Sequence, residues 1–307
     1  MERFFPGRLI FISLILLIAV GSSLSGCAPS GSAANVAAAA YIQNKGSDTI
    51  VNLALAWAEA YQKEHPEVRI SVTGGGSGTG IASLINGTLD IANASRQITA
   101  DEIKQAQANG LNPVEFVIAR DAIAVIVNPN NPVSKLTMEQ ISAIYKGEIN
   151  NWKEVGGEDR PIVRLSRESN SGTHLYFLQT VIRLGSSTDK SIFSPTTLLL
   201  PSSEGIIAEL TDNPNAIGYD GLGYVTPGVK VIAVAKTADD AYILPSVATV
   251  NSGTYPIARD LYMYTGHAPS GAIKAYLDWI VSAEAQQIVA QLGFVPILAK
   301  NTVTATP

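Results

Sequence analysis

A glycine-rich turn between a strand-like and a helix-like segment constrains the fold of this chain more than any other feature. Residues 74–80 read Gly-Gly-Gly-Ser-Gly-Thr-Gly; they follow the strand-like segment 68–73 and precede an apolar run with Ile81, Leu84 and Ile85. Glycine permits a tight backbone turn, and the first N–H groups of a helix have no partner within that helix. The turn therefore predicts a strand, an anion-accepting loop and a helix in succession.

Two further turns have the same design. Residues 46–49 read Gly-Ser-Asp-Thr before a long helix-like run. Residues 167–173 read Arg-Glu-Ser-Asn-Ser-Gly-Thr before a run in which Leu175, Leu178 and Ile182 share one helical face. Each turn taken alone is also consistent with an ordinary Ser/Thr helix cap. Three hydroxyl-bearing turns that each open a helix, one of them with an arginine, instead indicate a pocket for a small oxyanion.

Strand-like and helix-like segments alternate through the rest of the chain, which predicts an α/β fold. We expect the long segments 114–127 and 255–264 to cross between two domains. The other expected strands are 41–44, 68–73, 89–94, 161–165, 229–234 and one from 216, and the other expected helices are 49–65, 99–108, 137–146, 203–210, 270–291 and one from the glycine turn to 86.

Length and composition favour two domains with a sizeable core. The chain has 307 residues, of which 46% are hydrophobic and 15% charged. The net charge of −5 argues against a nucleic-acid partner, because binding a phosphate backbone needs a basic surface. An anion site must therefore be local and built from aimed donors.

The N-terminus predicts export. Two arginines precede the apolar segment 9–20, and small residues lead to Leu-Ser-Gly-Cys at 24–27, an ending that resembles the bacterial lipobox. A plain transmembrane anchor is the alternative, but the apolar segment is shorter than the ~20 residues that a spanning helix needs. We expect residues 1–26 to be a lipoprotein signal peptide and 27–40 a flexible tether. Cys27, the one cysteine of the chain, would carry the lipid on the outer face of a bacterial membrane.

Motifs for catalysis do not fit. No lysine follows the glycine turn as a P-loop requires, and Ile81 stands where a dinucleotide fingerprint needs its third glycine. Thr79 breaks the Gly-x-Ser-x-Gly elbow around Ser77. His174 follows Ser171 by three residues, but a histidine in the first turn of a helix is more typical of a surface or supporting group. We expect no catalytic residue, no cofactor and no metal site.

Several ordered motifs resemble the phosphate-binding lipoproteins that feed bacterial high-affinity phosphate ABC transporters. The resemblance covers nearly the whole mature chain, through the segments 46–49, 74–80, 136–147, 167–173 and 216–219. It implies a two-lobed periplasmic-binding-protein-like fold of type II, with two crossing strands and a ligand cleft between α/β lobes. The implied lobes are 41–121 with 253–307, and 122–252.

The resemblance also implies the ligand and its contacts. The ligand would be inorganic phosphate and the partner a membrane permease, with the protein itself a monomer and the membrane reached only through Cys27. The implied ligand-binding residues are Ser47, Asp48, Thr49, Ser77, Gly78, Arg167, Ser171, Gly172 and Thr173, and by hypothesis we add Arg96 to them.

Two positions depart from the family pattern. Arg96 stands where well-known members carry the aspartate that accepts the proton of hydrogen phosphate, and Ser169 replaces a second acidic residue. Our hypothesis is that Asp48 takes over as acceptor, with Arg96 balancing its charge or touching the ligand. The alternatives are a plain helix-capping role for Asp48 and a salt bridge within or between the lobes for Arg96.

Other functions stay open at this point. Sulfate, molybdate or arsenate is the nearest alternative ligand, and a serine-type hydrolase is the alternative from another class. A sensor or adhesion protein with the same fold is a further alternative.

Overall fold

The computed structural model describes residues 40–297 and 304–305 of the chain. The expected signal peptide, Cys27 and the tether as far as residue 39 lie outside the described residues. Within the described part, no helix has both the length and the apolar character to cross a membrane.

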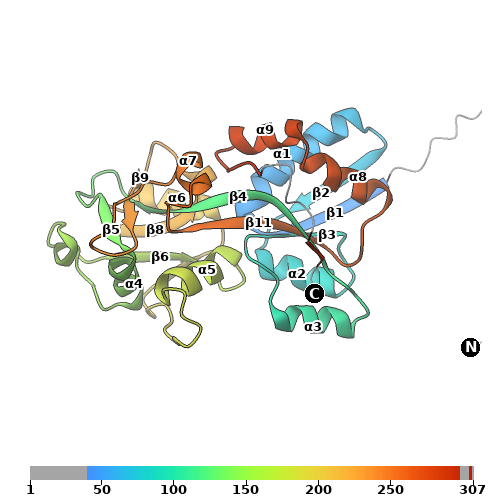
Figure 1. Ribbon diagram of the computed structural model, residues 1–307. Coiled ribbons are helices and arrows are strands. Elements are labelled where there is room, and N and C mark those ends of the chain that lie inside the picture. Colours follow the sequence, from blue (N-terminus) through green and yellow to red (C-terminus); the bar gives the residue numbers. More distant parts are fainter. Residues whose placement is uncertain (1–39, 298–303, 306–307) are drawn as a thin grey trace, which may run out of the picture. The chain divides into compact units, whose positions relative to one another are not determined.

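Strands and helices alternate along the chain, as the sequence pattern predicts (Figure 1). The strands are β1 (Ala40–Gly46), β2 (Val68–Thr73), β3 (Ile91–Ala94), β4 (Val114–Val127), β5 (Lys135–Thr137), β6 (Val163–Arg167), β7 (Leu198–Leu200), β8 (Ala216–Gly221), β9 (Lys230–Val231), β10 (Ala233–Ala235), β11 (Ala258–Thr265) and β12 (Thr304–Ala305). The α-helices are α1 (Asp48–Glu64), α2 (Ser77–Ile85), α3 (Ala100–Ala108), α4 (Met138–Lys146), α5 (Gly172–Phe177), α6 (Ser203–Asp212), α7 (Val247–Asn251), α8 (Gly271–Ile280) and α9 (Ala283–Gln291). The short helical turns are η1 (Trp152–Val155), η2 (Leu178–Ile182, π-helical) and η3 (Leu222–Tyr224).

One sheet runs through the described part in the order β2-β1-β3-β11-β4-β8-β6-β7. The long strand β4 belongs to both ends of it: residues 114–122 pair with β11, and residues 123–127 pair with β8. Figure 1 shows β4 and β11 passing side by side between two groups of elements. We call β1–β3 with α1–α3, α8 and α9 the first lobe, β5–β10 with α4–α7 the second lobe, and β4 and β11 the crossing strands.

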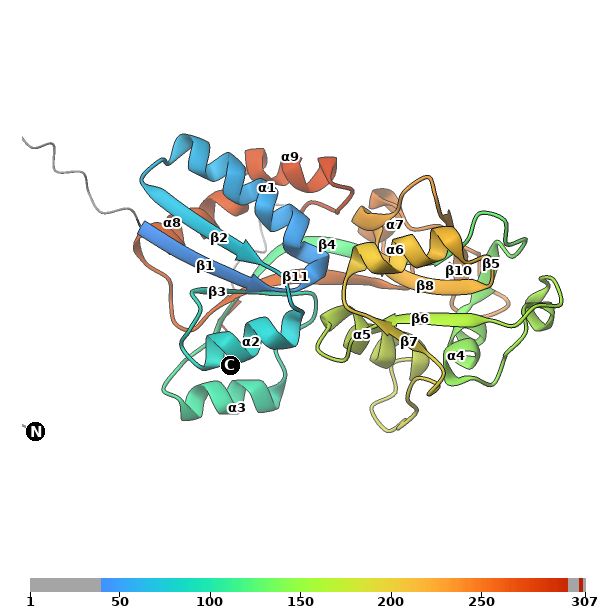
Figure 2. The same cartoon turned by 180° about the vertical axis from the view of Figure 1, so that it is seen from behind.

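Helices cover both faces of the sheet in each lobe (Figures 1 and 2). In the first lobe, one apolar core joins α1, α8 and α9 to the sheet around Trp57, and another joins α2 and α3 to its other face. In the second lobe, the larger core lies on the α4 and α5 side around Tyr145, and a smaller one packs α6 around Leu210. Each lobe is therefore a helix–sheet–helix sandwich, and only the turns at the strand ends are left to face the other lobe.

Local signals set most element boundaries. The strand at 68–73 is confirmed residue for residue, and the first helix ends at Glu64, just before Pro66. The expected capping box at Thr99 is present, with Glu102 bonding back to the Thr99 amide. These signals were readable because each depends on neighbours in sequence.

Three expectations were wrong in detail. The helix expected over 270–291 is two helices, because Ser282 accepts a hydrogen bond from the amide of Ala285 and starts α9 afresh. The strand expected over 229–234 is split between β9, which pairs with β4, and β10, which pairs with β5. Leu175 and Leu178 are only partly buried, since the π-helical turn η2 shifts the buried face to Phe177 and Val181.

The contact between α2 and β1 requires Gly80. A Cβ at this position would lie 2.6 Å from the Lys45 carbonyl oxygen and 2.7 Å from Gly46 Cα, so the helix would have to move away from the sheet. We expect Gly80→Ala to lower the free energy of unfolding by about 1–3 kcal/mol, although alanine favours helix more than glycine does. Urea unfolding followed by circular dichroism measures this.

Gly205→Ala is the matched control. Gly205 also lies in a helix, α6, but a Cβ there would make its nearest contact at 3.4 Å, with Ser202 Oγ. This variant should match or slightly exceed the wild type in stability. Equal stability of Gly80→Ala and wild type would show that the helix–strand contact tolerates a side chain.

Candidate functional site

Hydroxyl groups from both lobes meet where the two lobes face each other. Ser47 Oγ, before α1, donates to Ser95 Oγ at 2.9 Å, and Ser77 Oγ, at the start of α2, lies 3.3 Å from the same Ser95 oxygen. Thr49 Oγ1 in the first lobe and Thr173 Oγ1 in the second share a hydrogen bond of 2.8 Å. All five side chains are buried. The three expected turns are therefore brought together, although they are far apart in sequence.

The start of α5 approaches the start of α2 so closely that only glycine fits. A Cβ on Gly172 would lie 2.3 Å from Ser77 Oγ and 2.7 Å from Ser95 Oγ. Asn170 joins the lobes beside this contact: its carbonyl accepts from Gly78 N at 2.9 Å and its side-chain amide donates to Gly75 O at 3.0 Å. The helix starts at α1 and α2 have no side-chain cap, so their amides are not claimed by a neighbouring hydroxyl.

Arg167 brings positive charge to this region from the end of β6. Its side chain is 1% exposed, and one nitrogen donates to Asp48 Oδ2 at 2.7 Å across the lobes and to the Pro201 carbonyl at 2.8 Å. Another nitrogen donates to Ser203 Oγ at 2.8 Å. A fork of fixed donors is what lets one arginine hold several oxygens at once.

Asp220 lies behind Arg167 in the second lobe. Its Oδ1 accepts from Ser203 Oγ at 3.0 Å and from Gly221 N at 2.7 Å, and its Oδ2 lies 3.7 Å from Arg167 and has no hydrogen-bond partner among the described residues. Burial raises the pKa of Asp220 to about 6, and the Arg167 charge opposes that rise. The guanidinium is therefore placed between one carboxylate from each lobe.

Arg259 is a second buried arginine at the same place, and sequence reasoning did not select it. It pairs with Asp121 on the neighbouring crossing strand at 3.0 Å, donates to the Ser95 carbonyl at 2.9 Å and donates to Thr173 Oγ1 at 2.9 Å. Burial raises the pKa of Asp121 while Arg259 opposes the rise. The available signal was an Arg-Asp dipeptide in each crossing segment, at 120–121 and 259–260.

Arg96 does not pair with Asp48. Both of its terminal nitrogens bond to the Glu102 carboxylate, at 2.8 and 2.7 Å, and this pairing lowers the pKa of Glu102 against the effect of burial. Arg96 therefore forms a salt bridge with Glu102 within the first lobe, which was one of the alternatives for this residue. Asp48 has Arg167 as its partner instead, and its other oxygen accepts from Gly75 N at 2.8 Å.

His174 is not arranged as a base for Ser171. Its Nδ1 lies 3.0 Å from Ser166 Oγ, the ring stacks on Phe193, and burial lowers its pKa. Ser171 Oγ accepts from the His174 amide as a helix cap. Ser171 and His174 therefore stabilise the start of α5 and its packing, and they do not form the nucleophile–base pair that a serine hydrolase needs.

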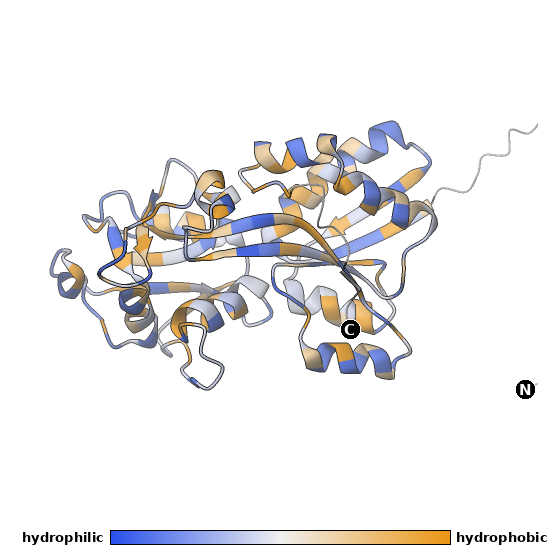
Figure 3. Cartoon of the chain, in the orientation of Figure 1, coloured by the Kyte–Doolittle hydropathy of each residue, from blue (hydrophilic) through white to orange (hydrophobic). Residues whose placement is uncertain are grey.

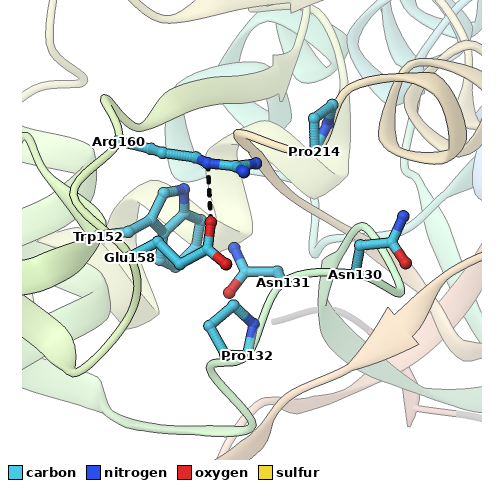
Figure 4. Close-up of a pocket in the computed structure, with 7 residues that line it drawn as sticks. All are labelled: Asn130, Asn131, Pro132, Trp152, Glu158, Arg160 and Pro214. Carbon is cyan, nitrogen blue, oxygen red and sulfur yellow. Dashed lines mark ion pairs between the residues drawn. The ribbon is translucent and has the colours of Figure 1, made fainter.

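Of two cavities in the protein, one lies beside this site whereas the other does not. A cavity of about 350 Å³ lies beside it and is lined by residues of both lobes and of β11, with Arg96, Tyr176, Arg259 and Tyr262 among them. A second pocket, in the second lobe, has room for about 10 Å³ and contains the Arg160–Glu158 ion pair, 2.8 Å long (Figure 4). The converging hydroxyls lie next to the first cavity only.

Comparison with known proteins now adds the family. Residues 31–284 match the family described as "PBP superfamily domain", and the chain is 32% identical over 276 residues to the "Phosphate-binding protein PstS" of Pseudomonas aeruginosa, covering 84% of each. The chain belongs to the PstS family.

Solved structures share the fold of this PstS-family chain. A structure from Clostridium perfringens with bound phosphate is 32% identical and has a TM-score of 0.74, with 84% of this chain and 100% of that chain covered. An ABC-type phosphate transport receptor from Vibrio cholerae is 31% identical with a TM-score of 0.67, over 83% of this chain and 100% of the other. The expected two-lobed α/β fold is confirmed.

The buried carboxylate of Asp220 gives this PstS-family chain a testable pH dependence. Its pKa is about 6 when folded and about 3.9 when unfolded, so the folded chain binds more protons between these values. Its contribution to the free energy of unfolding is complete below about pH 4 and is lost as the pH rises to about 6. The loss is on the order of 3 kcal/mol.

We expect Asp220→Asn to lack this component. Chemical denaturation of both proteins at intervals from pH 4 to pH 7.5 measures it, and the stability of the variant relative to wild type should rise across that range. An asparagine keeps an acceptor for Ser203 and Gly221, so loss of these bonds does not confuse the result. A constant difference between the two proteins at every pH would show that Asp220 does not titrate there.

Proposed function

We propose that this PstS-family chain captures inorganic phosphate and delivers it to the membrane permease of an ABC transporter. The observation that carries the proposal is the convergence of three hydroxyl-bearing helix starts in one buried region, to which Arg167 is joined by its ion pair with Asp48. The names of its relatives, a phosphate-binding protein and a phosphate transport receptor, support the same ligand. The proposed role is binding and delivery without catalysis.

The proposed ion lies between the starts of α1, α2 and α5. Ser47, Thr49, Ser77, Ser171 and Thr173 would offer hydroxyl groups, and Gly78 and Gly172 backbone amides. Each hydroxyl that now bonds to a neighbour, and the Gly78 amide that now donates to the Asn170 carbonyl, would exchange that partner for an oxygen of the ion. Such completeness is needed, because a buried anion loses its water and every oxygen left without a donor costs free energy. Arg167 would supply the positive charge.

The proposed site closes from two sides. Its donors come from α1 and α2 in the first lobe and from β6 and α5 in the second, so the lobes must be together for the ion to be fully held. Binding would then stabilise the closed arrangement by mass action. The lobe limits 41–121 with 253–307, and 122–252, belong to this proposal.

The rest of the transport role rests on sequence alone. The lipobox-like ending at 24–27 supports lipid attachment at Cys27 and a place on the outer face of a bacterial membrane, where a binding protein meets its permease. We propose that the protein works there as a monomer, without a nucleic-acid partner.

Replacement of Arg167 tests the binding site. We expect wild-type protein to bind inorganic phosphate and Arg167→Lys to bind it at least 30-fold more weakly, because lysine keeps a charge but cannot reach Asp48, Ser203 and the ion together. Isothermal titration calorimetry gives both affinities.

Arg160→Lys is the matched control, since it makes the same change at a half-exposed arginine of the second lobe (Figure 4). It should bind as the wild type does. A wild-type protein that takes up no phosphate, or an Arg167→Lys variant with full affinity, would remove the proposal.

Asp48→Asn tests how phosphate is separated from sulfate. We propose that a carboxylate oxygen of Asp48 accepts the proton of hydrogen phosphate, which sulfate lacks at neutral pH. Both oxygens of Asp48 already accept one bond, but each has a second lone pair. The variant should then lose about tenfold or more of the ratio of phosphate to sulfate affinity.

The two roles of Asp48 give different results in this titration. If Asp48 only ties the lobes together through Arg167, both affinities should fall by the same factor and their ratio should stay that of the wild type. An unchanged ratio would therefore end the acceptor hypothesis without touching the proposed function.

A further inference from the structure

The crossing strands contain two Arg–Asp pairs that face in opposite directions. Arg259 lies opposite Asp121 in the β4–β11 ladder, and Asp260 lies opposite Arg120. The first pair is buried, with side chains 2% and 0% exposed, and the second is 38% and 41% exposed. Neighbouring residues of a strand point to opposite faces, so one pair faces the site and the other faces water. Figure 3 shows the hydrophilic colour interrupting both crossing strands at this point.

The buried pair makes contacts that the exposed pair does not. The guanidinium of Arg259 donates to the Ser95 carbonyl of the first lobe, to Thr173 Oγ1 of the second lobe at 2.9 Å, and to Thr49 Oγ1 of the first lobe at 3.4 Å. Asp121 and the ring of Tyr176, 5.4 Å from the guanidinium, hold the group in place. One side chain on a crossing strand therefore touches both lobes.

These contacts fix the direction of two hydroxyl groups. A threonine hydroxyl has one proton to give and two lone pairs, whereas a guanidinium can only donate. Thr49 and Thr173 must therefore each use a lone pair toward Arg259, which leaves the proton of each to point elsewhere. The two hydroxyls share a hydrogen bond of 2.8 Å, so one proton now lies between them and the other points elsewhere. An oxygen of a bound ion would replace that mutual bond, and both hydroxyls could then donate to the ion.

We propose that Arg259, held by Asp121, is a positioning residue that sets Thr49 and Thr173 as hydrogen-bond donors to the bound oxyanion. It acts through the two hydroxyls and not by touching the ion. Arg259 also links the crossing strands to lobe closure, because its hydrogen bond with Thr173 can form only while the two lobes are together. This inference rests on the proposed function.

Arg259→Lys is the first test. Lysine keeps a positive charge beside Asp121 but cannot reach both threonines and the Ser95 carbonyl. We expect phosphate affinity, measured by calorimetry, to fall about 10- to 100-fold. Arg120→Lys, the same change in the exposed pair of the same two strands, should bind phosphate as wild type does. Arg259→Gln combined with Asp121→Asn removes both charges together and keeps the test usable if the lysine variant does not fold.

A double-mutant cycle separates this role from a purely structural one. In a Thr49→Val/Thr173→Val background, Arg259→Lys should cause little further loss of affinity, since the groups through which it acts are gone. A loss of the same factor in both backgrounds would overturn the inference, as would full affinity in Arg259→Lys. Wild-type protein that binds no phosphate would instead overturn the proposed function, and the inference with it.

Discussion

The pairing of buried charges is the constraint on which the rest of the structure depends. Arg167 and Arg259 are each almost wholly removed from water, and a buried guanidinium is stable only beside an acidic partner. Asp48 and Asp121 supply those partners, one across the lobes and one across the crossing strands. The arrangement of the lobes is therefore tied to the charges between them. Separation of the lobes would expose Arg167 and release Asp48.

This constraint explains why the crossing strands are polar in the middle. The second-lobe part of β4 is apolar, with Ile123 to Val127 fully buried, as expected for a strand covered on both faces. Charges at 120–121 and 259–260 occur only where the strands leave one core and have not entered the next. Charged residues in the middle of these strands reduce the apolar core at that point, but they place Arg259 where it contacts both lobes.

The sequence predicted the parts of the site that depend on neighbours in the chain. Each hydroxyl-bearing turn was readable because a glycine, a Ser or Thr and an apolar run stand together. The partner of Arg259 was not readable, since Asp121 is 138 residues away and only the register of β4 and β11 brings the two together. The sequence left a salt bridge open for Arg96 but did not identify the partner. Its partner Glu102 is only six residues away, but that residue had already been given to the capping box, and it serves both.

The charges around the proposed ion also bear on its selection. Two arginines stand against three carboxylates, those of Asp48, Asp121 and Asp220, so no net positive field draws a dianion into the closed site. Affinity must then come from aimed N–H and O–H groups, which reward shape and hydrogen-bond pattern more than charge. Under our hypothesis an ion that carries a proton would donate to Asp48, whereas a fully ionised one would meet only repulsion there. On this proposal, the surplus of acid beside the donors would favour hydrogen phosphate over sulfate, even with an arginine where the family resemblance leads us to expect an aspartate.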